Sequence, residues 1–449
     1  AILSGHPKIL LNKGRLGWGA SELNHYAPEC ARPFQLFWCA AVPSPFVRQA
    51  YSPGYDLLSE SLSPDERAAI QTQLLERGLD PARISIFPVH PAQWDRILQT
   101  QYVSEIATGR LLGLGRYGDH YRPQISIRTL SNVTRPERAD LKLSVSILNT
   151  SAVRGIAPKY IPLIPALSER LDKICQTDPV LSASRTEILR EIGGLSYANP
   201  TFQRVSGAPY RYQESLGCIW RESTASHLQA NERAVLTGAL AHRDSIGRTL
   251  LSGYAHQSGL SLTQWLGEYF KVTVIPLYHL QKKYGVGIVA HGQNVVVRLA
   301  EGRPTGMFLK DFQGDLRLLD VLPPDGEREF NEFESVLTRL PAHYLIHDLI
   351  TGHLVTVLRF LSAALFESEG LAETEFYEIL SREIRSYCLT QGINDAHLDL
   401  LQPRVQRLLL NPVRFKLGYA DSDIRPLPQL GPEISNPLLL FSVSDQEYS

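Results

Sequence analysis

The order in which strand-like and helix-like segments follow one another constrains the fold of this chain most strongly. Up to about residue 320, short apolar runs and turns alternate with helical patterns, whereas the later segments are mostly helical. This order is typical of an α+β fold with two lobes and a cleft between them. We expect an N-terminal lobe over residues 1–205 and a second lobe over residues 206–449.

Individual segments give the expected elements. Apolar or alternating runs predict strands at residues 34–42, 84–89, 124–130, 141–149 and 211–220. Helical patterns predict helices at residues 63–78, 166–192, 231–252 and 261–284. The first begins at the cap residue Ser63, and the second ends at Gly193-Gly194. Residues 285–299 and 305–320 predict a hairpin, and the proline-rich tail from Asn411 predicts irregular structure.

The charge balance and the cysteines limit the class of protein. Lys and Arg number 45 and Asp and Glu number 46, so no basic footprint for nucleic acid exists and a small anionic substrate fits better. The most apolar stretch, residues 349–366, contains His353 and Arg359, so it predicts a buried helix and no membrane span. Five widely spaced cysteines without a CxxC pair indicate free thiols, no structural zinc and a cytoplasmic protein.

Cations and hydroxyls between residues 126 and 154 are candidates for a phosphate site. On the predicted strand 124–130, Ser126 and Arg128 share one face and Thr129 follows them. Lys142 lies on the expected partner strand, and Arg154 lies just beyond its end. Arg forks bind phosphate oxygens and Lys acts as a point charge, so convergence of these groups would suit a triphosphate. The alternative is a solvated strand face with scattered cations.

The predicted hairpin carries a second group of polar residues. His291 and Asn294 lie on one arm and Asp311 on the other, and cross-strand pairing can bring them within a few ångströms. The oxygens of Asn294 and Asp311 would suit Mg²⁺, which takes few protein oxygens and completes its shell with phosphates and water. The alternative is a hydrogen-bonded strand histidine without a metal.

The first residues of the chain offer a third group. His6, Lys13 and Arg15 stand in a loop punctuated by glycines, and closely spaced cations of this kind suit a carboxylate substrate. Plain solvation suits them nearly as well. Because the chain starts at Ala1 without an initiator methionine, we also expect a longer N-terminus in the whole protein.

Taken in their order, these segments resemble the IucA/IucC siderophore synthetases, ligases that work independently of non-ribosomal peptide synthetases. The resemblance is strong over about residues 5–315 and looser beyond. The segments that carry it are Gly5-His6-Pro7, Lys13 to Gly17, Tyr26 to Glu29, Phe87 to Pro91 with Gln93, Ser126 to Leu130, Leu141 to Leu143, Asn149 to Gly155, Leu216 to Glu222, His291 to Asn294 and Lys310 to Phe312. One departure is Val289, which stands where the family often has an acidic residue.

The resemblance implies a cupped, hand-like fold of fingers, palm and thumb with ATP in a central cleft. It implies that the phosphates and the acyl carboxylate contact Ser126, Arg128, Thr129, Lys142 and Arg154. It further implies that His291 and Asn294 line the nucleotide site, that Asp311 and Asn294 bind Mg²⁺, and that His6, Lys13, Arg15 and His90 border the substrate. Arg154, His291 and Lys142 would be the catalytic residues, and a homodimer is the expected assembly.

The implied activity is the ATP-dependent conversion of a carboxylic acid to an acyl-adenylate, followed by attack of an amine or hydroxyl. The segment from Asn149 to Ile156 favours a citryl monoamide or a succinyl-hydroxamate as the acid, with free citrate and 2-oxoglutarate as alternatives. A non-catalytic binder of siderophore precursors and an ATP phosphotransferase are the alternatives from other classes.

Overall fold

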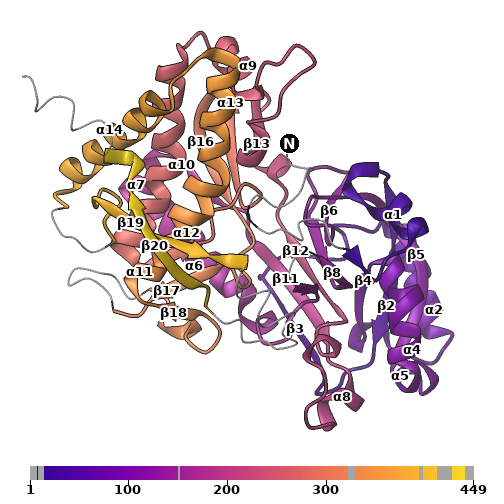
Figure 1. Ribbon diagram of the computed structural model, residues 1–449. Helices are drawn as coiled ribbons and strands as arrows, with labels where there is room; N and C mark the ends of the chain where they lie inside the picture. Colours follow the sequence, from indigo (N-terminus) through magenta and orange to yellow (C-terminus); the bar gives the residue numbers. More distant parts are fainter. Residues whose placement is uncertain are drawn as a thin grey trace, which may run out of the picture.

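The structure is a computed structural model that describes residues 8, 15–149, 152–321, 329–393, 398–411 and 427–439. Within these ranges the chain folds into mixed helices and sheets, as the order of its segments predicts (Figure 1). Two of the predicted substrate residues, His6 and Lys13, lie outside the described residues.

An eight-stranded antiparallel sheet forms the centre of the N-terminal part. From edge to edge its strands are β3 (Val47–Tyr51), β11 (Glu191–Tyr197), β12 (Gly217–Arg221), β7 (Asp140–Leu143), β6 (Thr129–Asn132), β5 (Leu111–Pro123), β2 (Phe34–Ala41) and β4 (Ser85–Val89). Both faces of β2 are buried, since Trp38 packs into one apolar cluster and Cys39 into another. Burial on both faces explains the continuous apolar run, and the strands predicted at 34–42 and 84–89 are confirmed.

Within the described residues, eight α-helices lie before or between the strands of this sheet along the chain. They are α1 (Ala20–Tyr26), α2 (Pro64–Leu75), α3 (Pro91–Gln93), α4 (Gln99–Gln101), α5 (Val103–Ala107), α6 (Ile164–Thr177), α7 (Pro179–Ala183) and α8 (Pro200–Arg204). The last turns of α6 and the short α7 pack toward the second part of the chain. The predicted start of α2 is confirmed, because the Ser63 side chain accepts a hydrogen bond from the Glu66 N–H. The short strands β1 (Arg15–Leu16), β8 (Val145–Asn149) and β9 (Ala152–Arg154) form a separate small sheet.

The strand predicted at residues 124–130 is wrong in its first part. Residues 124–128 form a turn, and β6 begins only at Thr129. Ile127 has φ +68°, a left-handed conformation that a β-branched residue rarely adopts, so Ser126 and Arg128 are not alternate residues of a strand. The run 141–149 is likewise divided into β7 and β8. The expected pairing between these two strands is present in a shorter form, as β6 and β7, with Thr129 opposite Lys142.

The second part is built on a four-stranded sheet in the order β10-β16-β15-β13. Its strands are β10 (Thr186–Ile188), β16 (Arg303–Leu309), β15 (Val295–Ala300) and β13 (Glu232–Leu236), and a further sheet contains β14 (Val286–Ile288), β17 (Leu316–Leu319) and β18 (Thr338–Leu340). The hairpin predicted over residues 285–299 and 305–320 is confirmed in its inner part as β15 and β16, whereas its outer parts form β14 and β17 of the further sheet. The predicted helix 261–284 is confirmed as α10 (Leu262–Tyr284). The buried faces of α10 and these sheets share one large core.

Two predicted helices are wrong over part of their length. Residues 186–192 form β10 and the start of β11, and Gly193-Gly194 lies inside β11. A Cβ on Gly193 would meet Leu57 Cδ1 at 2.5 Å, so this glycine permits close packing against the sheet and does not end a helix. Residues 231–252 contain β13 and a turn, and a helix, α9 (Leu250–Ser258), begins only near their end.

The C-terminal part is mostly helical, as predicted, up to a final hairpin. Its helices are α11 (Ala342–Leu345), α12 (His347–Leu349), the π-helix η10 (Ile350–Leu358), α13 (Arg359–Glu369) and α14 (Glu373–Gln391). The continuous helical stretch Ala342–Glu369 is long and apolar enough to cross a membrane, but 56% of its most apolar window is buried inside the protein, as in a core helix. β20 (Gln429–Ser435) pairs with β19 (Arg404–Leu409), so the tail is not irregular throughout.

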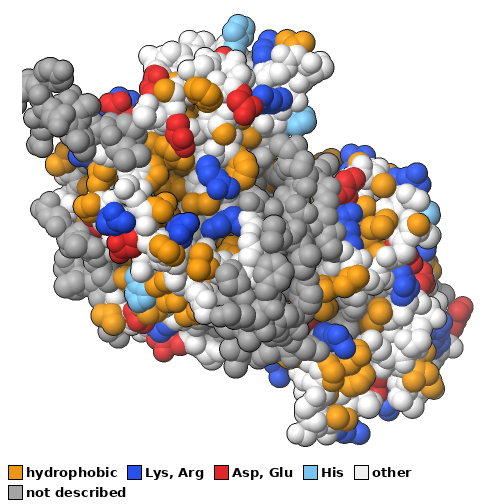
Figure 2. Space-filling model, in the orientation of Figure 1, with side chains coloured by type: hydrophobic (Ala, Val, Ile, Leu, Met, Phe, Trp, Pro, Cys, Tyr) orange, Lys and Arg blue, Asp and Glu red, His pale blue; other side chains and the backbone are white. Residues whose placement is uncertain are grey.

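The two parts interlock. In Figure 1 the indigo and purple N-terminal part and the orange and yellow C-terminal helices form separate lobes, and β11 and β12 run between them. The predicted boundary at residue 205 cuts the eight-stranded sheet, because β12 pairs with β7 and β11, while β10 belongs to the other sheet. On the face in Figure 2, Lys and Arg side chains are interspersed with Asp and Glu, in keeping with the balanced charge.

Candidate active site

A row of buried charged and polar side chains crosses one face of the eight-stranded sheet. Glu191 on β11 lies opposite Arg221 on β12, and Arg221 lies opposite Asp140 on β7. Lys142, two residues along β7, shares the face of Asp140 and lies opposite Thr129 on β6. All five side chains are buried. We call these five residues the polar row.

Asp311 joins this row from the other sheet, just beyond the end of β16. Lys142 Nζ and Arg221 Nη1 both donate to Asp311 Oδ1, each at 3.1 Å. Arg221 Nη2 also donates to Asp140 Oδ2 at 2.9 Å. Burial by itself raises the pKa of the Asp311 carboxyl, but Lys142 and Arg221 hold that pKa well below its ordinary value. Asp311 is therefore an ionised carboxylate that links the two sheets.

Lys310 and Gln124 extend the network. The Lys310 ammonium donates to Gln124 Oε1 at 3.0 Å, and the Gln124 amide donates to Asp140 Oδ2 at 2.7 Å. Burial, followed by the charge of Arg221, lowers the pKa of Lys310 to about 8. Cationic groups thus gather in a poorly solvated region, where they act on an anion more strongly than they would in water.

The turn before β6 carries one cation, Arg128, which links it to the segment after Arg154. The Ser126 side chain accepts a hydrogen bond from the Thr129 N–H at 3.3 Å, which closes the turn around the strained Ile127. Arg128 donates to the carbonyl of Gly155, the residue after Arg154. Strained backbone persists only where surrounding contacts enforce it, and it concentrates at functional sites. The structure therefore brings Ser126, Arg128, Thr129, Lys142 and the Arg154 segment together through a turn rather than a strand face.

The His291–Asn294 loop lies beside Lys310, the residue before Asp311, but its side chains pair with a different carboxylate. The Asn294 carbonyl accepts from the Lys310 N–H at 3.2 Å, which fixes the loop next to the end of β16. The Asn294 amide donates to Asp315 Oδ2 at 3.1 Å, and His291 Nε2 lies 4.0 Å from the same oxygen. The hairpin pattern predicts that Asn294 meets Asp311. The structure instead places Asp315 between the imidazole and the amide.

The side-chain oxygens of this region are the kind of ligand that a hard cation prefers. Asp311, Asp315 and Asn294 supply carboxylate and amide oxygens, and Mg²⁺ prefers such ligands together with phosphate and water. Among the described residues, no group of three or more His, Cys, Asp or Glu side chains is arranged as a ready metal site. A divalent cation here would depend on a phosphate ligand as well as on the protein.

The predicted substrate residues that the structure describes lie outside this network. Arg15 Nη2 donates to Glu29 Oε1 at 2.7 Å and pairs through its backbone with Asn149 of β8. The His90 ring has no exposed surface and packs against Tyr26 and Phe34 at centroid distances of 4.7 and 5.2 Å. His90 is therefore buried within an aromatic cluster, and its contact with the substrate stays a prediction.

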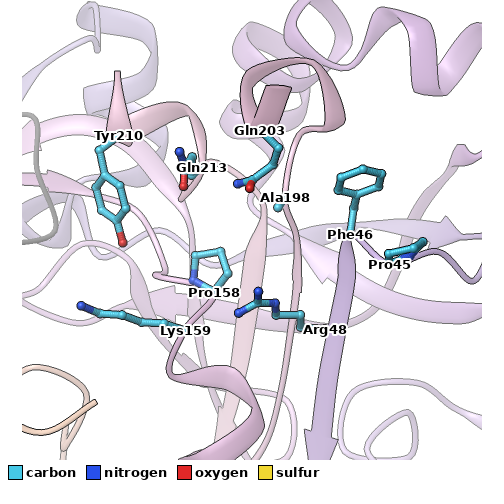
Figure 3. Close-up of a pocket in the computed structure, with 9 residues that line it drawn as sticks. All are labelled: Pro45, Phe46, Arg48, Pro158, Lys159, Ala198, Gln203, Tyr210 and Gln213. Carbon is cyan, nitrogen blue, oxygen red and sulfur yellow. The ribbon is translucent and has the colours of Figure 1, made fainter. Parts of the chain in front are cut away.

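A hollow near the other end of β11 contains none of the predicted site residues. It has a volume of about 200 Å³, and Figure 3 shows Arg48, Pro158 and Lys159 along one side and Tyr210, Gln213 and Gln203 along the other. Pro158 comes four residues after Arg154, so the hollow is close to the Arg154 segment in sequence. The polar row lies at the opposite end of β11, so the hollow is not part of it.

Sequence reasoning misses Glu191, Arg221, Asp140 and Gln124 as site residues. The sequence pattern includes Arg221 in a motif without giving it a role, and it assigns Glu191 to the end of a helix. The signal that could have found Glu191 is a carboxylate at the start of an otherwise apolar run, since buried charges are rare unless they serve a partner.

Comparisons with known proteins show which proteins this chain is similar to. The model of the IucA / IucC family matches residues 1–242, and a model described as ferric iron reductase FhuF-like transporter matches residues 263–422. The aerobactin synthase of Vibrio mimicus is 40% identical over 97% of this chain and 74% of that protein. The aerobactin synthase of Escherichia coli is 38% identical over 100% of this chain and 77% of that protein. The structure of aerobactin synthetase IucC from a hypervirulent pathotype of Klebsiella pneumoniae is 36% identical, with a TM-score of 0.84 over 97% of this chain and 75% of that one.

Proposed function

This chain belongs to the IucA / IucC family, and from that membership we propose that it is an ATP-dependent ligase of siderophore biosynthesis that joins a carboxylic acid to an amine or hydroxyl. Its relatives include two aerobactin synthases, which supports a ligase acting on small molecules. The observation that carries the proposal is the convergence of Lys142, Arg221 and the strained Ser126–Thr129 turn on one buried region between two sheets.

The chemistry explains why such a site needs fixed cations. A carboxylate is a poor electrophile, and transfer of AMP from ATP to its oxygen, with pyrophosphate leaving, makes an acyl-adenylate that an amine attacks with release of AMP. Negative charge grows on the phosphoryl oxygens and on the leaving pyrophosphate. Arg128, Lys142 and Arg154 would stabilise that charge, and Ser126 and Thr129 would donate hydrogen bonds to phosphate oxygens.

The same region would hold the divalent cation that accompanies the nucleotide. Asp311, Asn294 and Asp315 would supply oxygen ligands or hydrogen-bond to bound water. When bound, Mg²⁺ neutralises charge on the phosphate oxygens. Asp311 also keeps Lys142 and Arg221 in place before a nucleotide arrives.

His291 would act in the second step. Its side chain is half-buried at the edge of the network and lies near the Asp315 carboxylate, which would orient the ring. A histidine in such a position can accept the proton that the attacking amine loses. For the acid, we favour a citryl monoamide or a succinyl-hydroxamate over free citrate and 2-oxoglutarate, because the chain resembles aerobactin synthases.

Pyrophosphate release tests the proposal. The purified chain is incubated with ATP, Mg²⁺ and each candidate acid, with and without a hydroxylated diamine, and nucleotide products are separated. We expect AMP and pyrophosphate with one class of acid. Arg154→Ala should lower the rate roughly 100-fold or more, as loss of a charge-stabilising donor does. Arg233→Ala, at an exposed position on β13, should leave the rate unchanged.

Other products would favour other functions. ADP as the nucleotide product would indicate a phosphotransferase, and binding of an acid without any turnover would indicate a non-catalytic binder. Either outcome in the folded chain would overturn the ligase proposal.

A further inference from the structure

Glu191 is the residue of the polar row whose charge the protein does not satisfy. Its side chain is 1% exposed, and neither carboxylate oxygen has a hydrogen-bond partner among the residues that the structure describes. By contrast, the other carboxylate of the row, Asp140, accepts bonds from Arg221 and Gln124. A buried carboxylate without partners costs far more than a buried neutral group, so the position calls for a ligand that the protein itself does not provide.

The surroundings of Glu191 limit what that ligand can be. Its cross-strand neighbour Arg221 directs both Nη atoms at Asp311 and Asp140, and Lys142 donates to Asp311. The nearby cations are therefore committed to other carboxylates. Burial is the main cause that raises the pKa of the Glu191 carboxyl. The charge of Lys142 lowers this pKa in part, and the charge of Asp311 raises it, which shows that the two carboxylates repel each other.

Asp311 offers the second half of a binding site. Lys142 and Arg221 both use its Oδ1, and none of the hydrogen bonds in the described part of the chain ends on Oδ2. A hard cation that met both Glu191 and Asp311 would satisfy the oxygens of Glu191 and the open oxygen of Asp311 at once. Such an ion would also offset the mutual repulsion of the two carboxylates.

We propose that Glu191 and Asp311 together bind the divalent cation that accompanies the nucleotide. Glu191 is supplied by the eight-stranded sheet and Asp311 by the loop after β16, so the ion would bridge the two sheets. This inference rests on the proposed function, because the remaining ligands of the ion are phosphate oxygens and water. It gives a specific task to a residue outside the nucleotide-binding motifs.

The test measures cation binding rather than turnover. Mn²⁺ is titrated into the chain in the presence of a non-hydrolysable ATP analogue, and free Mn²⁺ is followed by electron paramagnetic resonance. Glu191→Gln keeps the volume of the side chain and removes its charge. We expect its Mn²⁺ affinity to fall at least about tenfold. The affinity for the analogue without metal should stay within about twofold of the unsubstituted chain.

Glu105→Gln is the matched control. Glu105 is also buried, but Arg110 Nε and the Tyr197 hydroxyl donate to its carboxylate at 2.8 and 2.5 Å. Tyr197 is the last residue of β11 and Glu191 the first, so this control lies at the other end of the strand. Its substitution should leave Mn²⁺ affinity unchanged. Melting curves show whether each variant folds, and Glu191→Asp, which keeps the charge but shortens the side chain, replaces Glu191→Gln if that variant does not fold.

The outcomes separate this inference from the proposed function. Equal Mn²⁺ affinity of the folded Glu191 variant and the unsubstituted chain, both binding the analogue, overturns the role of Glu191 and leaves the ligase proposal standing. Failure of the unsubstituted chain to bind the analogue at all overturns both. A selective loss of Mn²⁺ affinity in the Glu191 variant supports the assignment.

Discussion

At the scale of single residues, Asp311 organises the candidate site. The sequence predicts it as a metal ligand, and the structure adds that it is the common acceptor of Lys142 and Arg221. Two buried cations held by one carboxylate are stable only while that carboxylate is charged. The same contact therefore decides both the stability of the free protein and the placement of the cations that would meet a phosphate.

Asp311→Asn tests this dependence. The amide keeps the shape but cannot neutralise Lys142 and Arg221, so we expect the free energy of unfolding to fall by about 3 kcal/mol. Urea denaturation at neutral pH measures it. Asp56→Asn breaks only an exposed ion pair with Arg67 and should change stability little. A loss no larger for Asp311→Asn than for Asp56→Asn would contradict the role given to Asp311.

At the scale of elements, the His291–Asn294 loop depends on a close backbone contact. Gly238 donates its N–H to the Gly292 carbonyl at 3.1 Å, and a Cβ on Gly292 would meet the Gly238 Cα at 2.7 Å. Both partners are backbone, so a side chain at residue 292 must displace the loop. That displacement would move His291 and Asn294 relative to Asp315.

Gly292→Ala should therefore reduce activity more than stability. We expect pyrophosphate release to fall about tenfold or more, because small displacements of catalytic groups are costly. Gly253→Ala is the control, since Gly253 lies in α9, no atom of the described residues lies within 4 Å of an added Cβ, and alanine favours a helix by about 1 kcal/mol. Steady-state kinetics and melting curves on both variants check this. Unchanged kinetics in Gly292→Ala would show that the loop tolerates the shift.

Elements with local signals could be predicted from sequence, and those defined by distant contacts could not. The cap at Ser63, the buried run of β2 and the β15–β16 hairpin carry their own patterns. β10 and β11 do not, because β10 has only three residues and every residue of β11 is buried, so no alternation marks a strand and the run resembles the end of a helix. Glu191 and Arg221 could not be predicted as site residues for the same reason, because their contact depends on the order of strands within the sheet.

At the scale of the whole molecule, a second charged cluster joins the two sheets next to the polar row, since Arg190 and Glu222 are the sequence neighbours of Glu191 and Arg221. His227 lies 3.4 Å from Glu187 of β10 and 3.3 Å from Glu222, the residue after β12. Arg298 of β15 also pairs with Glu187, and Arg190 pairs with Glu222. Because β10 and β12 belong to different sheets, this cluster helps to set how the two halves of the candidate site meet.

The two flanking carboxylates make the cluster sensitive to pH. Hydrogen bonds to Glu187 and Glu222 raise the pKa of His227 to about 9. Asp172 of α6 also adds negative charge nearby, whereas Arg190 and Arg298 neutralise part of it. A histidine whose pKa is raised by folding stays protonated to a higher pH in the folded protein than in the unfolded chain.

The stabilisation from His227 should be complete below its unfolded pKa of about 6.5 and should disappear as pH rises through about 9. A folded pKa that lies one pH unit above the unfolded pKa corresponds to about 1.4 kcal/mol of stability, and partial exposure reduces the effect, so we expect on the order of 2 kcal/mol at pH 6. Urea unfolding of the chain and of His227→Gln, from pH 6 to pH 10, measures the difference. The two stabilities should converge at high pH, because neutral His227 no longer attracts Glu187 and Glu222. His256→Gln, at an exposed position in α9, should follow the unsubstituted chain throughout. A constant difference between His227→Gln and the unsubstituted chain across this range would show that His227 joins the two sheets by packing rather than by charge.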